Sequence, residues 1–507
     1  MRTKNLFINL FVLIIKTVFS VVIGVILPKI YISTYGSEVY GAIGSITTIV
    51  NYFTLIEMGF GGAMLYALYK PIADNDEEGI NSVVNSAGKA YKKMGLILMT
   101  LVVSLACVYP LIVDSQFKYI TLSTIVIVLG LPVIIDFFIY YKFLNLINAY
   151  KKLYIISLAN LLEKIFTFIF IYFLAKQHLN VVFILCVPGV FSIIRVIVIL
   201  IYIQKKFPFI KSNQTDNTVV IKSRRDTVFT AVAAKMQYSI PIIVATLIAS
   251  LEEVSVMTVY NMILIGVGSI LSLVSSPSYS IFGEIIAKES KEKFQNTFSD
   301  FEGVYFFIVT IVFSATIILL QSFIKIYTQN ITDVNYDNFL FGILFTISFL
   351  IDTWRIPFEI LVNSGGLYRE ARTINIIYSV FVFGLTTLFG LLWGLNGIAI
   401  GMIVSNLYRL ISFIWLINRL KYYSKVKQTY KRLILSTMVL ILNSLVLIVM
   451  SKFKIDGYVL WILMGTIVFI ASSFITIIAN YIFDKPLIVN LRKRIITLIN
   501  KKTAKTF

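Results

Sequence analysis

Apolar and polar residues follow one another along this chain in long blocks. Fourteen apolar stretches are separated by polar connections. An α-helix rises 1.5 Å per residue, so about 20 residues cross a bilayer core of about 30 Å. The pattern therefore predicts an all-α polytopic membrane protein with about 14 transmembrane helices. The approximate limits of the stretches are 6–32, 39–69, 95–114, 119–148, 153–175, 181–203, 227–249, 254–283, 303–326, 337–363, 373–394, 396–418, 433–452 and 457–483.

Lysine and arginine residues are distributed unevenly between alternate connections. If the N-terminus is inside, the cytoplasmic segments carry 32 of them, against five in or beside the outside connections. Cytoplasmic loops of membrane proteins are enriched in Lys and Arg. The asymmetry predicts that both termini lie in the cytoplasm. All outside connections are short, so we expect no domain on that side.

The composition narrows the class of protein. The chain has 507 residues, is 58% hydrophobic and 14% charged, and carries a net charge of +20. Its basic residues are scattered between the spans, so we expect no nucleic-acid partner. The two cysteines lie in apolar stretches and the single histidine has no metal-ligand spacing around it, so we expect no metal and no other cofactor. No glycine-rich phosphate loop is present, so any transport is expected to be secondary, not driven by a nucleotide.

Charged residues recur at matched positions in the two halves of the chain. The matched pairs are Lys16 and Lys235, Asp136 and Asp352, and Arg195 and Arg409. The two members of each pair are separated by nearly the same length of chain, which indicates one duplicated unit of six spans. Because six is even, both copies start inside, and such parallel repeats enclose a central substrate site in transporters. We therefore expect two pseudo-symmetric lobes.

The repeat predicts six segments. They are an N-terminal six-helix lobe at 1–203, a cytoplasmic linker at 204–226, a C-terminal six-helix lobe at 227–418, a cytoplasmic loop at 419–432, two additional transmembrane helices at 433–483 and a basic cytoplasmic tail at 484–507.

Lys16 is the most informative single residue. It lies ten residues into the first apolar stretch, about 15 Å deep, where it is too far from either surface to snorkel. An ionisable group at that depth costs on the order of 3 kcal/mol and faces a protein interior or a water-filled cavity. Two interpretations stay open: an ion pair between helices, or a cation that receives an anionic substrate. Its counterpart Lys235 favours the second.

Other intramembrane charges admit the same two interpretations. Arg195, Arg355 and Arg409 are weaker candidates for binding an anion. Glu57, Asp136 and Asp352 could balance the cations or carry a coupling ion. Within the spans we count eight cations against five carboxylates, and this excess of cations indicates an anionic cargo.

Two cytoplasmic connections have an amphipathic helical pattern. One apolar face includes Ile80, Val84 and Tyr91, and a second includes Phe294 and Phe298. We expect both segments to be helices that lie along the membrane surface.

Short motifs near the N-terminus resemble those of a known family. The motifs are Tyr35-Gly36-Ser37-Glu38-Val39-Tyr40-Gly41, the stretch Leu55–Gly61, and the loop that begins Lys70-Pro71-Ile72-Ala73. With 6+6+2 spans, the chain resembles the polysaccharide-repeat (O-antigen and capsule) flippases of the multidrug/oligosaccharidyl-lipid/polysaccharide (MOP) exporter superfamily. The resemblance implies a MATE-like, V-shaped transporter with a basic cavity, into which Lys16 and Lys235 would fit.

The resemblance also implies a function and partners. The cargo would be an undecaprenyl-pyrophosphate-linked oligosaccharide, moved from the cytoplasmic to the outer leaflet of a bacterial plasma membrane. Membrane lipids, a polysaccharide polymerase and a chain-length regulator would be its partners, and the two additional helices would border a groove for the isoprenoid tail. The alternatives are a multidrug exporter or a peptidoglycan-precursor exporter of the same superfamily. An enzyme such as a membrane polysaccharide polymerase is less favoured, because the chain has no large outside loop and no cytoplasmic acidic motif.

Overall fold

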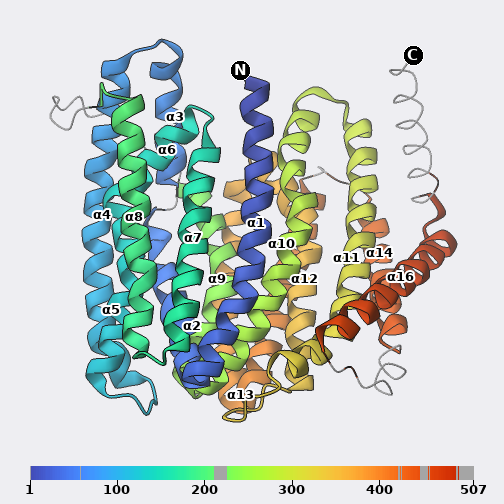
Figure 1. Ribbon diagram of the computed structural model, residues 1–507. Helices are drawn as coiled ribbons and strands as arrows, with labels where there is room; N and C mark the ends of the chain where they lie inside the picture. The colour runs from blue at the N-terminus through green and yellow to red at the C-terminus, as the bar shows by residue number, and fades with distance from the viewer. Residues whose placement is uncertain are drawn as a thin grey trace. The chain divides into compact units, whose positions relative to one another are not determined.

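The fold is known from a computed structural model that describes residues 2–57, 59–210, 225–420, 425–445 and 457–486, with the single residues 423, 455 and 489. All regular elements in these ranges are helices (Figure 1). Eleven of them are long and apolar enough to cross a membrane. The predicted class, an all-α polytopic membrane protein, is confirmed.

The described contacts divide the chain into two compact units. Unit 1 contains residues Met1–Met262 and Asn330–Val334, and unit 2 contains Ile263–Gln329 and Asn335–Phe507. The elements of unit 1 are α1 (Arg2–Tyr35), α2 (Ser37–Phe53), η1 (Thr54–Glu57), α3 (Phe60–Ala73), α4 (Glu77–Ile112), α5 (Tyr119–Ile135), η2 (Asp136–Tyr140), α6 (Tyr141–Ala149), α7 (Leu153–Lys176), α8 (Val181–Lys206), α9 (Arg225–Ile248) and the start of α10 (Leu251–Lys288). Those of unit 2 are the rest of α10, α11 (Lys291–Tyr327), α12 (Phe339–Ser364), α13 (Tyr368–Arg419), α14 (Val426–Ser444) and α16 (Tyr458–Phe483).

Unit 1 extends further along the chain than the predicted first lobe, because α9 packs against α2. The lobe limits at 203 and 227 therefore stay a prediction based on the repeat. Most of the predicted linker and most of the basic tail, residues 211–224 and 490–507, lie outside the described residues. Part of the predicted loop at 419–432 and the end of the stretch at 433–452 lie outside them as well.

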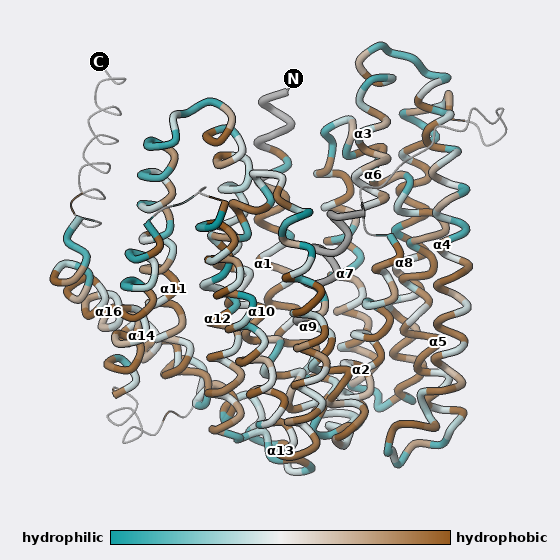
Figure 2. The backbone as a smooth tube through the Cα atoms, turned by 180° about the vertical axis from the view of Figure 1, so that it is seen from behind, coloured by the Kyte–Doolittle hydropathy of each residue, from teal (hydrophilic) through white to brown (hydrophobic). Residues whose placement is uncertain are grey.

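Within the described ranges, each predicted apolar stretch corresponds to one helix or to a broken helix. The second stretch is interrupted at η1, a 3₁₀ turn, and the fourth at η2, a π-helical turn. The element α13 consists of two helices, one for each of two predicted spans, because its backbone leaves the helical region at Trp393 and Gly394. Gly394 has φ of +57°, which favours glycine. Along these helices the middles are hydrophobic, and the loop that joins α3 to α4 is hydrophilic (Figure 2).

The two amphipathic segments are helical, but they are not separate surface helices. The Asp76 side chain accepts a hydrogen bond from the Gly79 N–H and caps α4, which then continues without a break into the third span. Ser290 begins α11 in the same way. The face around Tyr91 is buried inside the protein, as is Phe298, so the expectation of helices that lie along the membrane is wrong.

The motif at residues 35–41 has a structural role within unit 1. Gly36 adopts φ of +87° and starts α2, and both the N–H and the hydroxyl of Ser37 donate to the Asp333 carboxylate, at 2.7 and 2.8 Å. The Glu38 carboxylate accepts hydrogen bonds from the loop after α4. At Gly41, a Cβ would lie 1.7 Å from the carbonyl oxygen of Leu251. The motif therefore sets how closely α2 approaches the start of α10.

Candidate functional site

Lys16 lies on α1 in unit 1 and is half-buried. Among the described residues it makes no ion pair and no hydrogen bond. Lys164 of α7 is near enough to repel it electrostatically, and the Lys164 ammonium donates to Ser20 Oγ, at 3.2 Å. Two cations therefore lie together near the middle of two spans. Sequence reasoning missed Lys164 as the neighbour of Lys16, because nothing in the sequence reveals which faces of these helices meet.

Lys235 lies on α9, also in unit 1, and its ammonium reaches the break in the second span. It donates to Thr54 Oγ1 at 2.5 Å and to the backbone carbonyl of Asn51 at 3.2 Å. A break in a membrane helix frees backbone carbonyls, which other groups must satisfy. The Glu57 carboxylate acts on Lys235 electrostatically and accepts a hydrogen bond from Tyr91 OH at 3.2 Å. Lys235 is therefore held by neutral oxygens, with one carboxylate nearby.

Arg195 organises a polar cluster in unit 1, which we call the first arginine cluster. Arg195 pairs with Asp136 and, at 2.8 Å, with Glu163. The Arg195 guanidinium also lies over the ring of Tyr140, 4.3 Å from its centroid. Asn160 Oδ1 lies 3.5 Å from the same guanidinium. Asp136 starts the π-helical turn η2, a local distortion that is often found at functional positions. Here one arginine serves two carboxylates.

A groove of about 600 Å³ between α7 and α8 lies against this cluster. Its walls are formed by apolar side chains such as Phe166, Phe183 and Val190, and Glu163 and Arg195 supply its polar lining.

Arg355 and Arg409 form the second arginine cluster, in unit 2. Arg355 pairs with Asp352 at 2.9 Å and with Glu359 at 2.8 Å. Arg409 is fully buried and donates to Asn375 Oδ1 at 3.2 Å. These two arginines and two carboxylates balance in charge, whereas the first cluster has one carboxylate in excess.

The two clusters share one feature, an arginine that faces an asparagine. Arg195 faces Asn160, and Arg409 faces Asn375. The two asparagines are separated by nearly the same length of chain as the two arginines are, and sequence reasoning did not single them out. The predicted pairs differ in their ion pairing, however: Asp136 pairs with Arg195, whereas Asp352 pairs with Arg355, and Arg409 makes no ion pair among the described residues. For Asp136, Arg195, Asp352 and Arg355, these contacts agree with the first of the two interpretations, in which the charges form ion pairs inside the protein.

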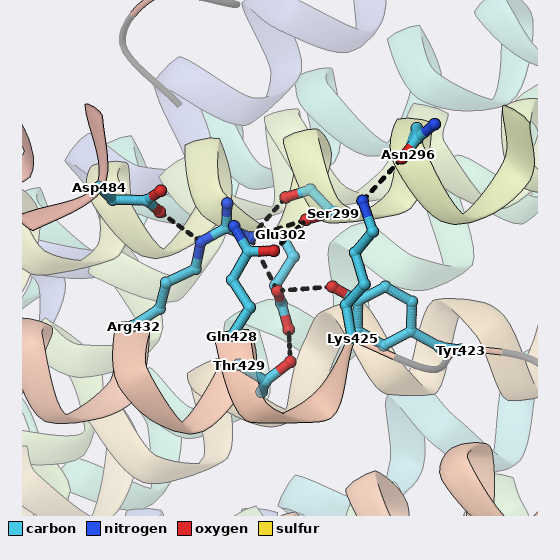
Figure 3. Close-up of polar contacts among 9 residues, drawn as sticks. All are labelled: Asn296, Ser299, Glu302, Tyr423, Lys425, Gln428, Thr429, Arg432 and Asp484. Carbon is cyan, nitrogen blue, oxygen red and sulfur yellow. Dashed lines mark hydrogen bonds and ion pairs between the residues drawn. The ribbon is translucent and has the colours of Figure 1, made fainter. Parts of the chain in front are cut away.

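A third polar cluster joins α14 and the end of α16 to α11 within unit 2 (Figure 3). Glu302 is fully buried, lies 2.9 Å from Arg432 Nη1 and accepts a hydrogen bond from Thr429 Oγ1 at 2.5 Å. Arg432 Nε also pairs with Asp484 at 2.6 Å. These contacts fasten α14 and the end of α16 to the start of α11, and Figure 3 shows the three charged side chains converging.

The structure therefore sorts the predicted site residues into two groups. Among the described residues, the predicted aspartates, Arg195 and Arg355 make ion pairs, whereas Lys16, Lys235 and Arg409 make none. A binding role for any of them stays a prediction.

Comparisons with known proteins bear on the fold. No family model matches the chain, and no curated protein matches it in sequence. Among solved structures, it is similar to the lipid II flippase MurJ in an inward closed conformation. That match has a TM-score of 0.65 and 16% identity, over 94% of this chain and 99% of that one.

Multidrug resistance MATE family transporters of the MOP superfamily are similar as well. An inward-facing structure matches with a TM-score of 0.64 and 15% identity, over 82% of this chain and 96% of that one. An outward-facing structure matches with a TM-score of 0.53 and 15% identity, over 84% and 95%. The chain is thus a multi-pass membrane protein with the fold of MOP superfamily transporters.

Proposed function

We propose that this protein is a flippase that moves an undecaprenyl-pyrophosphate-linked oligosaccharide from the cytoplasmic to the outer leaflet of a bacterial plasma membrane, for capsule or a related surface polysaccharide. It works by alternating access around a cationic cavity, with both termini in the cytoplasm. A polysaccharide polymerase and a chain-length regulator would act on its product.

The observation that carries this proposal is the state of the intramembrane lysines. Lys16 and Lys235 lie at mid-span with no ion pair among the described residues. A charge at mid-span without a counter-ion is unfavourable, and an anionic ligand removes that penalty. Opposite charges about 4 Å apart at an effective dielectric of about 20 attract by about 4 kcal/mol, comparable with the cost of burying one lysine. A diphosphate group supplies such an anion, while a cationic drug does not.

The arginines have a different role in this proposal. Arg195 and Arg355 are each occupied by two carboxylates, so they contribute less to binding than the lysines do. The ion pairs of Arg195 join η2 and α7 to α8, whereas those of Arg355 lie within α12. Glu57 remains the candidate for ion coupling, since it lies beside Lys235 at the break in the second span.

The test uses the host strain with its own gene deleted. We expect the wild-type gene to restore surface polysaccharide, and Lys16→Ala and Lys235→Ala each to abolish it while the protein remains in the membrane. The measurements are immunoblots of surface polysaccharide and of the membrane fraction. Lys176→Ala, which removes a lysine at the end of α7, serves as the control and should export normally. Normal export by both Lys16→Ala and Lys235→Ala would refute the proposal.

A second candidate is a flippase for the peptidoglycan precursor. The observation that favours it is the match to MurJ, which covers more of this chain than the MATE structures do. Expression of the protein in a strain depleted of its lipid II flippase separates the two functions. Restored growth would favour the second candidate, and restored surface polysaccharide without restored growth would favour the first.

A further inference from the structure

We propose that Lys16 and Lys164 together form a two-cation site for a diphosphate group on the seam between α1 and α7. This inference rests on the proposed function and adds to it a second binding residue, Lys164, and the place in the fold where the diphosphate is held.

Hydrogen bonds near both ends fix the register of α1 against α7. Asn9 Oδ1 accepts a hydrogen bond from the Tyr154 N–H at 2.7 Å, near the start of both helices. At the other end, Tyr35 OH donates to the carbonyl of Leu179 at 2.8 Å. The partners in these two bonds have nearly the same separation in sequence, so α1 and α7 run parallel without a shift in register over their length.

The two lysines lie close together on this seam. Lys164 donates to Ser20 in the same register, and Ser20 lies one helical turn beyond Lys16 on the same face of α1. The two lysines are thus about one turn, or roughly 6 Å, apart along the helix axes. Lys164 lies near the middle of α7, far from both of its ends.

Neither Lys16 nor Lys164 pairs with a carboxylate among the described residues. The nearest carboxylate in sequence, Glu163, points about 100° away around α7 and is engaged by Arg195 and by Ser192 Oγ, at 2.8 Å each. Lys164 has Ser20 as its hydrogen-bond partner among the described residues, and Lys16 has none. Two like charges one turn apart repel each other, and an anion with at least two charges that lies between them removes the repulsion. A diphosphate fits this requirement better than a monophosphate does, because each ammonium can donate to a different phosphoryl group.

The test measures binding to the purified full-length protein in detergent by isothermal titration calorimetry. The probes are geranylgeranyl diphosphate, geranylgeranyl monophosphate, geranylgeraniol and inorganic pyrophosphate. The variants are Lys16→Gln, Lys164→Gln and Lys164→Arg. The matched control is Lys176→Gln, which removes a lysine about 18 Å further along α7.

We expect wild-type protein to bind the diphosphate lipid at least tenfold more tightly than the monophosphate, and geranylgeraniol weakly. Lys16→Gln and Lys164→Gln should each weaken diphosphate binding about tenfold or more and remove the preference over monophosphate. Lys164→Arg should retain that preference, and Lys176→Gln should match the wild type.

Without ligand, Lys16→Gln and Lys164→Gln should melt at the same or a higher temperature than the wild type, because a repelling charge is gone. A purely structural lysine would instead lower the melting temperature.

The outcomes separate this inference from the proposed function. If the wild type binds no diphosphate probe, the proposed function fails. If it binds the diphosphate lipid and Lys164→Gln binds it equally well, the function stands and the two-cation site is wrong. If pyrophosphate binds with the same dependence on both lysines, the site is supported and a free diphosphate is a ligand as well.

Discussion

At the scale of single residues, the intramembrane charges differ in whether a protein group neutralises them. Arg195 is enclosed by Asp136 and Glu163, whereas Lys16 makes no ion pair among the described residues. The sequence predicts that certain charges correspond between the two halves, and this correspondence stays a prediction. It did not predict that Glu163 would complete the first cluster or that Lys164 would approach Lys16, because those contacts depend on the rotation of each helix against its neighbours.

This difference predicts opposite effects of removing the two charges. Arg195→Met leaves two partly buried carboxylates without a cation, so we expect it to destabilise the protein by about 3 kcal/mol, the lower end for a broken buried pair. Lys16→Met removes a charge that no carboxylate balances, so stability should be unchanged or higher. The measurement is thermal unfolding of the purified variants in detergent. Equal losses of stability in both would show that Lys16 has a protein partner after all.

At the scale of helices, the apolar pattern predicted most elements but not their interruptions. At the 3₁₀ turn before Gly59, Lys235 of another helix binds the Asn51 carbonyl, and at the π-helical turn Asp136 pairs with Arg195. The hydropathy of a segment does not show where a polar contact from another helix will interrupt it. The amphipathic face of residues 80–91 was read correctly as helical. Its burial could not be seen, because an apolar face that packs on protein has the same pattern as one that packs on lipid.

The contact between α2 and the start of α10 gives a prediction about close packing. Gly41→Ala would put a methyl group against the backbone of Leu251, which cannot move aside as a flexible side chain can. We expect a loss of about 1–3 kcal/mol, measured as a fall in melting temperature. The matched control is Gly24→Ala on α1, where no atom lies within 4 Å of the added methyl group. That substitution should be neutral or stabilising, since alanine favours a helix over glycine. Equal behaviour of the two variants would contradict the close approach.

At the scale of the whole molecule, the duplicated unit and the Lys/Arg asymmetry predict a topology. Alkaline phosphatase folds only outside the cytoplasm, so fusions report the side of each loop. We expect high activity after residue 178, in the predicted outside connection between α7 and α8, and low activity after residue 212 and after residue 507. High activity at residue 507 would overturn the placement of the C-terminus.

The cluster in Figure 3 has a consequence for how the chain is made. Glu302 is synthesised long before its partners Arg432 and Asp484. Until the ribosome has delivered α14, the carboxylate lacks the cation that neutralises it in the finished protein, so the start of α11 reaches its final packing only late in biogenesis. A chain that stops after α13 would lack Arg432, the cation that pairs with Glu302 in the complete protein. The residues around α14 and at the end of α16 therefore neutralise a charge on α11, whatever those two helices contribute to transport.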